Sequence, residues 1–131
     1  MKLFLDDVRV PKVAYSYTRN TIFLEDGWDI VRDYDQFVAW ITKNGLPDFI
    51  AFDHDLADEH YSIHNQVGDI KYDEMTEKTG MDCAKWLVDY CMDNELRLPE
   101  WYTHSMNPAG TQNIDSLLVN FKKHQEKNGF K

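Results

Sequence analysis

Four short apolar runs, separated by polar or helix-like sequence, constrain the fold of this chain most strongly. They cover residues 3–5, 28–31, 49–52 and 101–103. An apolar run of this length that is bounded by turn residues is typical of a buried strand. Because helical periods lie between the runs, we predict an α/β fold with a mostly parallel sheet of about four strands and flanking helices.

Three segments repeat apolar residues at helical spacing. The first covers about residues 35–44 and stops at Gly45, while the second and third follow the cap residues Thr79 and Asn107. Residues 8–27 show no clean period, so we expect mostly irregular structure there, with room for one helical turn.

The length and composition suit one domain over residues 1–131. Of the 131 residues, 43% are apolar, which is enough to build a core. Residues 56–79 are polar, acidic and poor in aliphatic side chains, so we expect a long acidic loop or lid inserted in the domain. Cys83 and Cys91 lie eight residues apart in one predicted helix, too far along its axis to bridge, and we expect reduced core thiols.

The charge balance limits the partners. The chain has 14 Lys and Arg against 23 Asp and Glu, which gives a formal net charge of -9. Such a chain lacks the positive charge that drives binding to long duplex nucleic acid or to anionic membranes. It also has no apolar stretch of about 20 residues and no signal-peptide pattern, so we expect a cytoplasmic protein without a membrane span.

Polar residues follow three of the predicted strands. Asp6 and Asp7 come after the first, and Asp53, His54 and Asp55 come after the third. The fourth is followed by two more such residues, His104 and Ser105. Because ligands bind at the carboxyl ends of strands in parallel sheets, we expect these side chains to converge on one rim.

Carboxylates at the ends of adjacent strands repel one another unless a cation lies between them. Oxygen ligands of this kind suit Mg²⁺, and nearby imidazoles also allow Mn²⁺. We therefore predict a metal site formed by Asp6, Asp7, Asp53 and Asp55. The alternative is that each acidic pair only opens a turn or caps a helix.

A phosphate fits beside such a metal. Ser105 stands just before a helix whose first N–H groups can bind an anion, and Arg9 can make a bidentate phosphate contact. A surface salt bridge is the alternative for Arg9. His54 and His104 fall on the same rim and could divide general acid and general base duties in phosphoester hydrolysis.

Four segments in this order resemble the cyclic-phosphate processing receiver domains, a branch of the response-regulator receiver superfamily common in bacteria and phages. They are LFLDDVRVP (3–11), IAFDHDL (50–56), TGMDCAKWLVDY (79–90) and HSMNPAGTQNI (104–114). The resemblance spans residues 1 to about 121 and implies a flavodoxin-like receiver fold.

The resemblance also implies roles for individual residues. It places Asp6 and Asp7 in the metal-binding acidic pair and Asp53 at the position of the receiver phospho-acceptor. Five further residues fall on the motif positions of this branch: His54, Asp55, His104, Ser105 and Asn107. The activity that it implies is processing of cyclic phosphates on nucleotides or RNA ends.

Three functional hypotheses follow. The first is a metal-dependent phosphoesterase that processes a cyclic phosphate or small nucleotide, with His54, His104 and Asp53 as catalytic residues, Arg9, Ser105 and Asn107 as phosphate contacts, and Mg²⁺ or Mn²⁺ as cofactor. The second is a non-enzymatic module that binds a nucleotide or a protein. The third is a signalling receiver phosphorylated on Asp53, which is disfavoured because no fifth strand with its terminal lysine is visible in the sequence.

Overall fold

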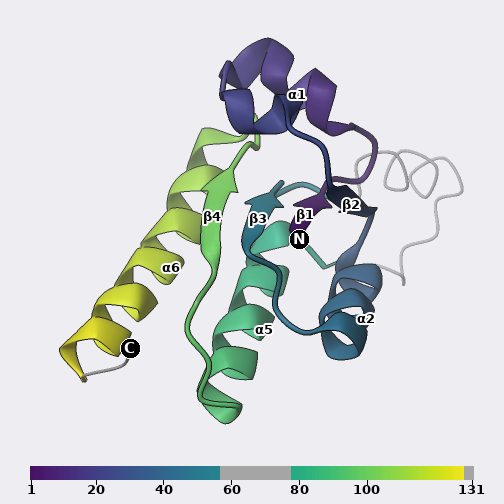
Figure 1. Ribbon diagram of the computed structural model, residues 1–131. Coiled ribbons are helices and arrows are strands. Elements are labelled where there is room, and N and C mark those ends of the chain that lie inside the picture. The colour runs from purple at the N-terminus through teal and green to yellow at the C-terminus, as the bar shows by residue number, and fades with distance from the viewer. Residues whose placement is uncertain (57–77, 129–131) are drawn as a thin grey trace, which may run out of the picture.

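The computed structural model describes residues 1–56 and 78–128, in which four strands form one parallel sheet (Figure 1). The strands are β1 (Lys2–Leu5), β2 (Trp28–Val31), β3 (Phe49–Phe52) and β4 (Glu100–Thr103), in the order β2-β1-β3-β4. Every neighbouring pair is parallel. The predicted α/β architecture is confirmed, and the part of the chain that is described contains no fifth strand.

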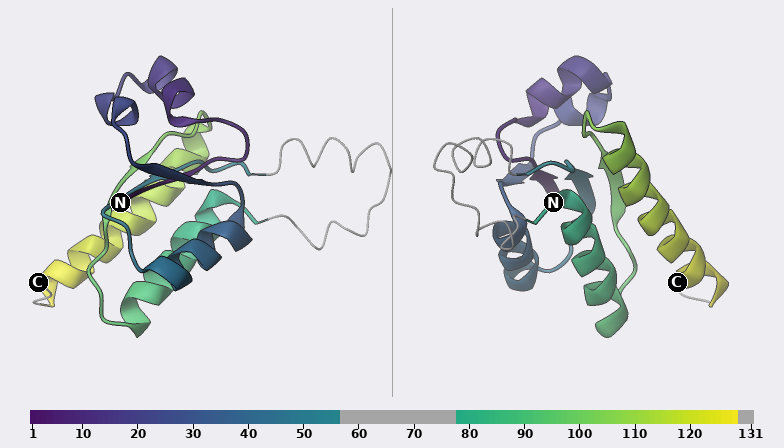
Figure 2. Two further views of the ribbon diagram at one scale, coloured as in Figure 1. Left: turned by 45° about the vertical axis from the view of Figure 1, so that its right-hand side comes forward. Right: turned by 180° about the vertical axis from the view of Figure 1, so that it is seen from behind.

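Helices cover both faces of the sheet, as the left view of Figure 2 shows. One face packs against α2 (Tyr34–Asn44), α5 (Gly80–Asp93) and α6 (Pro108–Lys127). The other packs against α1 (Pro11–Thr18) and the 3₁₀ helix η1 (Thr21–Leu24). This layering follows from the alternation of side chains along a strand.

Both cores are built from alternate strand residues. Leu3 and Leu5 of β1 are fully buried towards α2, α5 and α6, whereas Phe4 between them is buried towards α1 and η1. Burial of an aliphatic or aromatic side chain contributes about 1.5–3 kcal/mol. Strand β1 is therefore fixed in place by packing on both of its faces.

Helix caps agree with the sequence signals. The Thr79 side chain accepts hydrogen bonds from the N–H groups of Met81 and Asp82, while the Asp82 carboxylate accepts from the N–H of Thr79. The Asn107 side chain likewise accepts from the N–H of Gly110 at the start of α6. These bonds satisfy N–H groups at the helix starts, where the helix itself offers no acceptor four residues earlier.

The expectation of mostly irregular structure in residues 8–27 was wrong, because α1 and η1 occupy much of this segment. Helix α1 begins with Pro11, a favourable first residue, but Ala14 is its only buried residue. A helix that buries one small side chain carries no periodic apolar face, which is why the pattern did not indicate it.

Two other expectations concern the cysteines and residues 56–79. Cys83 and Cys91 are free and buried, as expected. Burial raises the pKa of the Cys91 thiol to about 12, so it stays protonated at neutral pH.

Most of the predicted acidic loop, residues 57–77, lies outside the described residues. Among those described, no helix combines the length and apolar composition needed to cross a bilayer.

Candidate functional site

The strand register builds one row of polar residues at the carboxyl edge of the sheet. Leu5 and Phe52 are register partners, as are Phe52 and the last residue of β4. The next residues along these three strands, Asp6, Asp53 and His104, continue the pairing. The N–H of Asp53 donates to the carbonyl of Leu5 at 3.1 Å, and that of His104 to the carbonyl of Phe52 at 2.9 Å. The sheet therefore places two carboxylates and an imidazole side by side.

Asp6, Asp7 and Asp53 form an acidic cluster. Each offers a carboxylate oxygen, and these three oxygens lie within 4.8 Å of one another. Asp6 and Asp53 are buried, while Asp7 is half-buried. Within residues 1–56 and 78–128, no other group of acidic, His or Cys side chains meets the same spacing. A donor set made only of carboxylate oxygens fits a hard cation such as Mg²⁺ or Mn²⁺.

Asp6 is held by four donors. One carboxylate oxygen accepts from the N–H groups of Val8 at 3.0 Å and Arg9 at 2.8 Å. The other accepts from the Arg9 guanidinium at 3.3 Å and lies 3.0 Å from His104 Nε2. Burial by itself would raise the pKa of Asp6, but the bonds from His104, Arg9 and Val8 outweigh burial and lower it to about 2. Asp6 is therefore ionised, with both oxygens occupied.

Asp53 has the opposite electrostatic environment. Burial, followed by the neighbouring negative charge of Asp6, raises the pKa of Asp53 to about 7. The Arg9 guanidinium lies 3.8 Å from an Asp53 oxygen and opposes this rise. A second cation beside Asp53 would remove the conflict, so the cluster fits a divalent ion electrostatically as well as in its donor chemistry.

The structure places His104 behind Asp6. Its side chain is 0% exposed, and its ring stacks on Phe4 with centroids 4.6 Å apart. Burial lowers the pKa of His104 despite the neighbouring Asp6, so the ring is neutral at pH 7. A neutral ring that donates from Nε2 leaves Nδ1 unprotonated, and Nδ1 is buried with no hydrogen-bond partner in the described part of the chain. His104 contacts Asp6 and is shielded from solvent.

His54 and Asp55 form a separate pair at the start of α6. His54 Nδ1 lies 2.8 Å from an Asp55 oxygen, and both Asp55 oxygens accept from the Asn107 amide at 3.3 Å. The His54 side chain is 18% exposed. Asp55, predicted as a metal ligand, is therefore brought to His54 and Asn107, and it is not a member of the acidic cluster.

Ser105 and Asn107 hold the start of α6. The Ser105 hydroxyl accepts from the N–H of Asn107 at 3.0 Å, and the Asn107 side chain accepts from the N–H of Gly110 at 2.9 Å. These bonds occupy groups that sequence reasoning assigned to a phosphate. Phosphate contact by Ser105 and Asn107 stays a prediction.

Two glycines allow helices to approach the strand-end residues closely. A Cβ on Gly80 would lie 1.8 Å from the carbonyl oxygen of Asp53, and one on Gly110 would lie 2.4 Å from Cγ of His54. Sequence reasoning missed both. The available signal was the presence of glycine, an unfavourable helix residue, in the first turn of each predicted helix.

Two further side chains near the cluster had no sequence signal. The Arg32 guanidinium donates to the carbonyls of Asp6 at 3.1 Å and Arg9 at 2.7 Å, which fixes the chain after β1. The ring of Tyr17 lies under the Arg9 guanidinium, 5.5 Å from its centroid. Burial raises the pKa of Tyr17 to about 12, and its buried hydroxyl has no hydrogen-bond partner within residues 1–56 and 78–128. The positions of the Arg32 and Tyr17 side chains both depend on tertiary contacts, which a local sequence pattern does not reveal.

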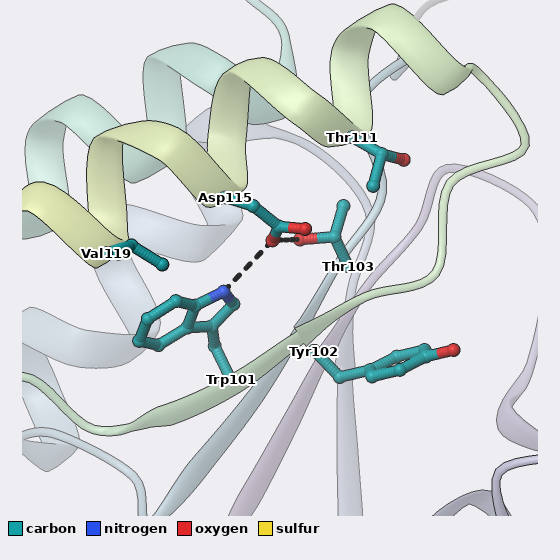
Figure 3. A pocket seen from close by; sticks show the side chains of 6 residues that line it. All are labelled: Trp101, Tyr102, Thr103, Thr111, Asp115 and Val119. Atoms are coloured by element: carbon teal, nitrogen blue, oxygen red, sulfur yellow. Dashed lines mark hydrogen bonds between the residues drawn. The ribbon is translucent and has the colours of Figure 1, made fainter.

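A cavity of about 430 Å³ lies between β4 and α6 (Figure 3). On its wall the Asp115 carboxylate accepts from Trp101 Nε1 at 3.1 Å and from the Thr103 hydroxyl at 2.7 Å. None of the acidic cluster lines this cavity. Three of its lining side chains, Trp101, Thr103 and Asp115, bond to one another, and the cavity is distinct from the rim site.

One family model matches nearly the whole chain. The model of the cyclic-phosphate processing Receiver domain matches residues 1–120. No curated protein matches the chain, and no solved structure does. The parallel four-stranded sheet with flanking helices is consistent with the flavodoxin-like receiver fold expected from the resemblance. The chain belongs to the cyclic-phosphate processing receiver domain family.

Proposed function

We propose that this domain is a metal-dependent phosphoesterase that opens the cyclic phosphate of a small nucleotide. The observation that carries the proposal is the acidic cluster, in which carboxylates from two adjacent strand ends lie within 4.8 Å of one another. The family is associated with cyclic-phosphate processing, which supports this choice of substrate.

Asp7 and Asp53 would hold Mg²⁺ or Mn²⁺, with Asp6 beside them. Asp6 already accepts four hydrogen bonds, so it supports the site electrostatically and through the position of its neighbours. When bound, the ion supplies Lewis-acid stabilisation of the negative charge that develops on a reacting phosphate. Asp55 lies with His54, and we assign it to that pair.

His54 is the residue that we assign to proton transfer. Its Nδ1 is engaged by Asp55, so Nε2 is the nitrogen left to exchange a proton with substrate. In hydrolysis, water adds to phosphorus, one P–O bond of the ring breaks, and the leaving oxygen takes up a proton. Arg9, at the edge of the cluster, would contact the phosphate, and His104 acts through Asp6 as a positioning residue.

A second candidate is a module that binds a nucleotide without turnover. The burial of His104 favours it, because only His54 of the two rim histidines is then in a position to contact a substrate. The two functions differ in one measurable way. The enzyme releases a phosphomonoester, whereas the module returns the ligand unchanged.

The test is incubation with a panel of 2′,3′- and 3′,5′-cyclic nucleotides, with Mg²⁺ or Mn²⁺, followed by ³¹P NMR. We expect a phosphomonoester signal that EDTA abolishes, and that His54→Gln lowers by about 10²–10⁴-fold. Asp53→Asn should abolish it. A ligand bound tightly but unchanged would favour the module, and neither binding nor product across the panel would overturn the proposal.

A further inference from the structure

Arg9 already places a positive charge inside the candidate metal site. Its guanidinium nitrogen Nη1 lies 3.3 Å from an Asp6 oxygen and 3.8 Å from an Asp53 oxygen. These two carboxylates come from adjacent strands and belong to the acidic cluster. Nη1 therefore lies between Asp53, which the proposed function assigns to the cation, and Asp6, which supports the site.

The contacts of Arg9 with these carboxylates are long. The 3.8 Å separation from Asp53 exceeds hydrogen-bond distance, and the 3.3 Å contact with Asp6 is at the long end of the range. Asp6 would still have three donors without it, namely two backbone N–H groups and His104. Moving Arg9 therefore leaves Asp6 well satisfied and leaves Asp53 without a positive neighbour among the described residues, which a divalent ion would supply.

The surroundings of Arg9 also leave it room to move. Its side chain is 28% exposed, and Nη2 lies 3.6 Å from the sulfur of Met106, a residue that is itself 63% exposed. The guanidinium rests on the Tyr17 ring, a contact that constrains its plane less than a bidentate carboxylate pair would. Arg32, by contrast, is fixed by two backbone carbonyls.

We propose that Arg9 is an internal counter-ion of the acidic cluster and that a divalent cation displaces its guanidinium from Asp6 and Asp53. This inference rests on the proposed metal-dependent function and adds an order of events to it. Without metal, Arg9 is engaged by carboxylates. With metal, the guanidinium is released at the rim, where it can bind a phosphate.

The displacement has a thermodynamic consequence. Because Arg9 and the cation compete for the Asp53 carboxylate, removal of the guanidinium strengthens metal binding. The charge of Arg32, whose guanidinium binds main-chain oxygens of the same segment, does not compete in this way. Arg32→Gln is therefore the matched control for Arg9→Gln, since both remove one positive charge near the site.

The experiment is calorimetric titration of the full chain with Mg²⁺ and with Mn²⁺, without nucleotide. We expect Arg9→Gln to bind about tenfold more tightly than the wild type, and Arg32→Gln not to gain affinity. An equal gain in both variants would show a general charge effect and overturn the inference. Unchanged or weaker binding by Arg9→Gln would also overturn it, while the metal site itself would stand if the wild type binds.

NMR of the wild type provides a readout that needs no variant. We expect the Arg9 Nε–Hε signal to shift during a Mg²⁺ titration, with the Arg32 signal unchanged. An Arg9 signal that does not respond while the metal binds would overturn the inference and leave the proposed function in place. Absence of metal binding by both the wild type and Arg9→Gln would overturn both.

Discussion

Asp6 and Asp53 are the same residue type at the ends of adjacent strands, yet their pKa values are shifted in opposite directions. Asp6 has four donors, and its pKa is about 2, whereas burial and the charge of Asp6 raise the pKa of Asp53 to about 7. The sequence predicts that both carboxylates end adjacent strands. It does not predict this difference, because the donors to Asp6 include His104, 98 residues away.

Asp53 should make the stability of the metal-free protein depend on pH. Its pKa is about 7 in the folded state against an ordinary 3.8, so between these values the folded protein binds more protons than the unfolded chain. The free energy of unfolding should therefore fall as the pH rises from about 4 to about 7, by on the order of 2–4 kcal/mol from this group, and this contribution should be constant above pH 7.

Urea unfolding in EDTA across this pH range checks the prediction, with Asp53→Asn as the reference. The variant should lack this decline and should be more stable than the wild type at pH 8. Asp6 does not contribute to the change in unfolding free energy between pH 4 and pH 7. Its pKa in the folded protein is lowered to about 2, so it stabilises the folded protein above its ordinary pKa of 3.8 and loses this contribution only as the pH falls below that value. Wild-type and variant curves that run parallel would contradict the account.

His104 should remain neutral down to its ordinary pKa of 6.5 and below it, because burial lowers its pKa. We also expect a single tautomer, with the proton on Nε2, because Nε2 faces the ionised Asp6. Long-range ¹H–¹⁵N NMR across a pH titration reports both properties. A titration midpoint at or above 6.5, or a proton on Nδ1, would show that the contact with Asp6 differs from the one described.

At the scale of elements, helix starts determine where the site residues lie. The first turns of α5 and α6 pack on the segment after β3, and in both helices a glycine makes the approach. The sequence predicted both helices and their caps because Thr79 and Asn107 carry local signals. It could not predict that Asp55 turns towards α6, since two residues after a strand the chain direction depends on tertiary contacts.

Gly110→Ala and Gly80→Ala should both destabilise the protein, and Gly80→Ala should do so more. At Gly110 the new Cβ would lie 2.4 Å from Cγ and 2.8 Å from Cβ of His54. Because rotation of the side chain does not move Cβ, the start of α6 must shift, and we expect a moderate loss of stability with a displaced His54 ring and lost turnover. At Gly80 the new Cβ meets the backbone carbonyl of Asp53 at 1.8 Å, so we expect destabilisation by about 2 kcal/mol or more.

Thermal unfolding and the NMR signals of the His54 ring separate the two variants. The Gly110→Ala protein should unfold at a temperature between those of the wild type and Gly80→Ala, with shifted His54 signals. Equal destabilisation of both variants, or unchanged His54 signals in Gly110→Ala, would show that α6 does not position this ring.

At the scale of the whole molecule, the sheet was the most predictable feature. All four apolar runs became strands. The central strands β1 and β3 are buried on both faces, and such burial leaves a continuous apolar signal that can be recognised without knowing the neighbouring strands. The strand order then brings Asp6 next to Asp53, which the sequence anticipated. The direction of individual side chains was harder to predict. His104 belongs to the same row of strand-end residues as Asp6 and Asp53, yet its ring is buried against Phe4.

The net charge of -9 predicts a preference among substrates that carry the same cyclic phosphate. A 2′,3′-cyclic mononucleotide should be hydrolysed faster than the same group at the end of a long RNA, because the acidic chain repels the polyanion. Added salt screens this repulsion, so the difference in kcat/KM should shrink as the salt concentration rises. Faster turnover of the RNA at low salt would contradict the prediction.

The central claim is that Asp7 and Asp53, supported by Asp6, hold one divalent cation. Anomalous diffraction from crystals soaked in Mn²⁺ tests it most directly. The account predicts one strong peak between the ends of β1 and β3, at a coordination distance of about 2 Å from carboxylate oxygens of Asp7 and Asp53. The absence of a peak there, or a peak at other residues only, would contradict it.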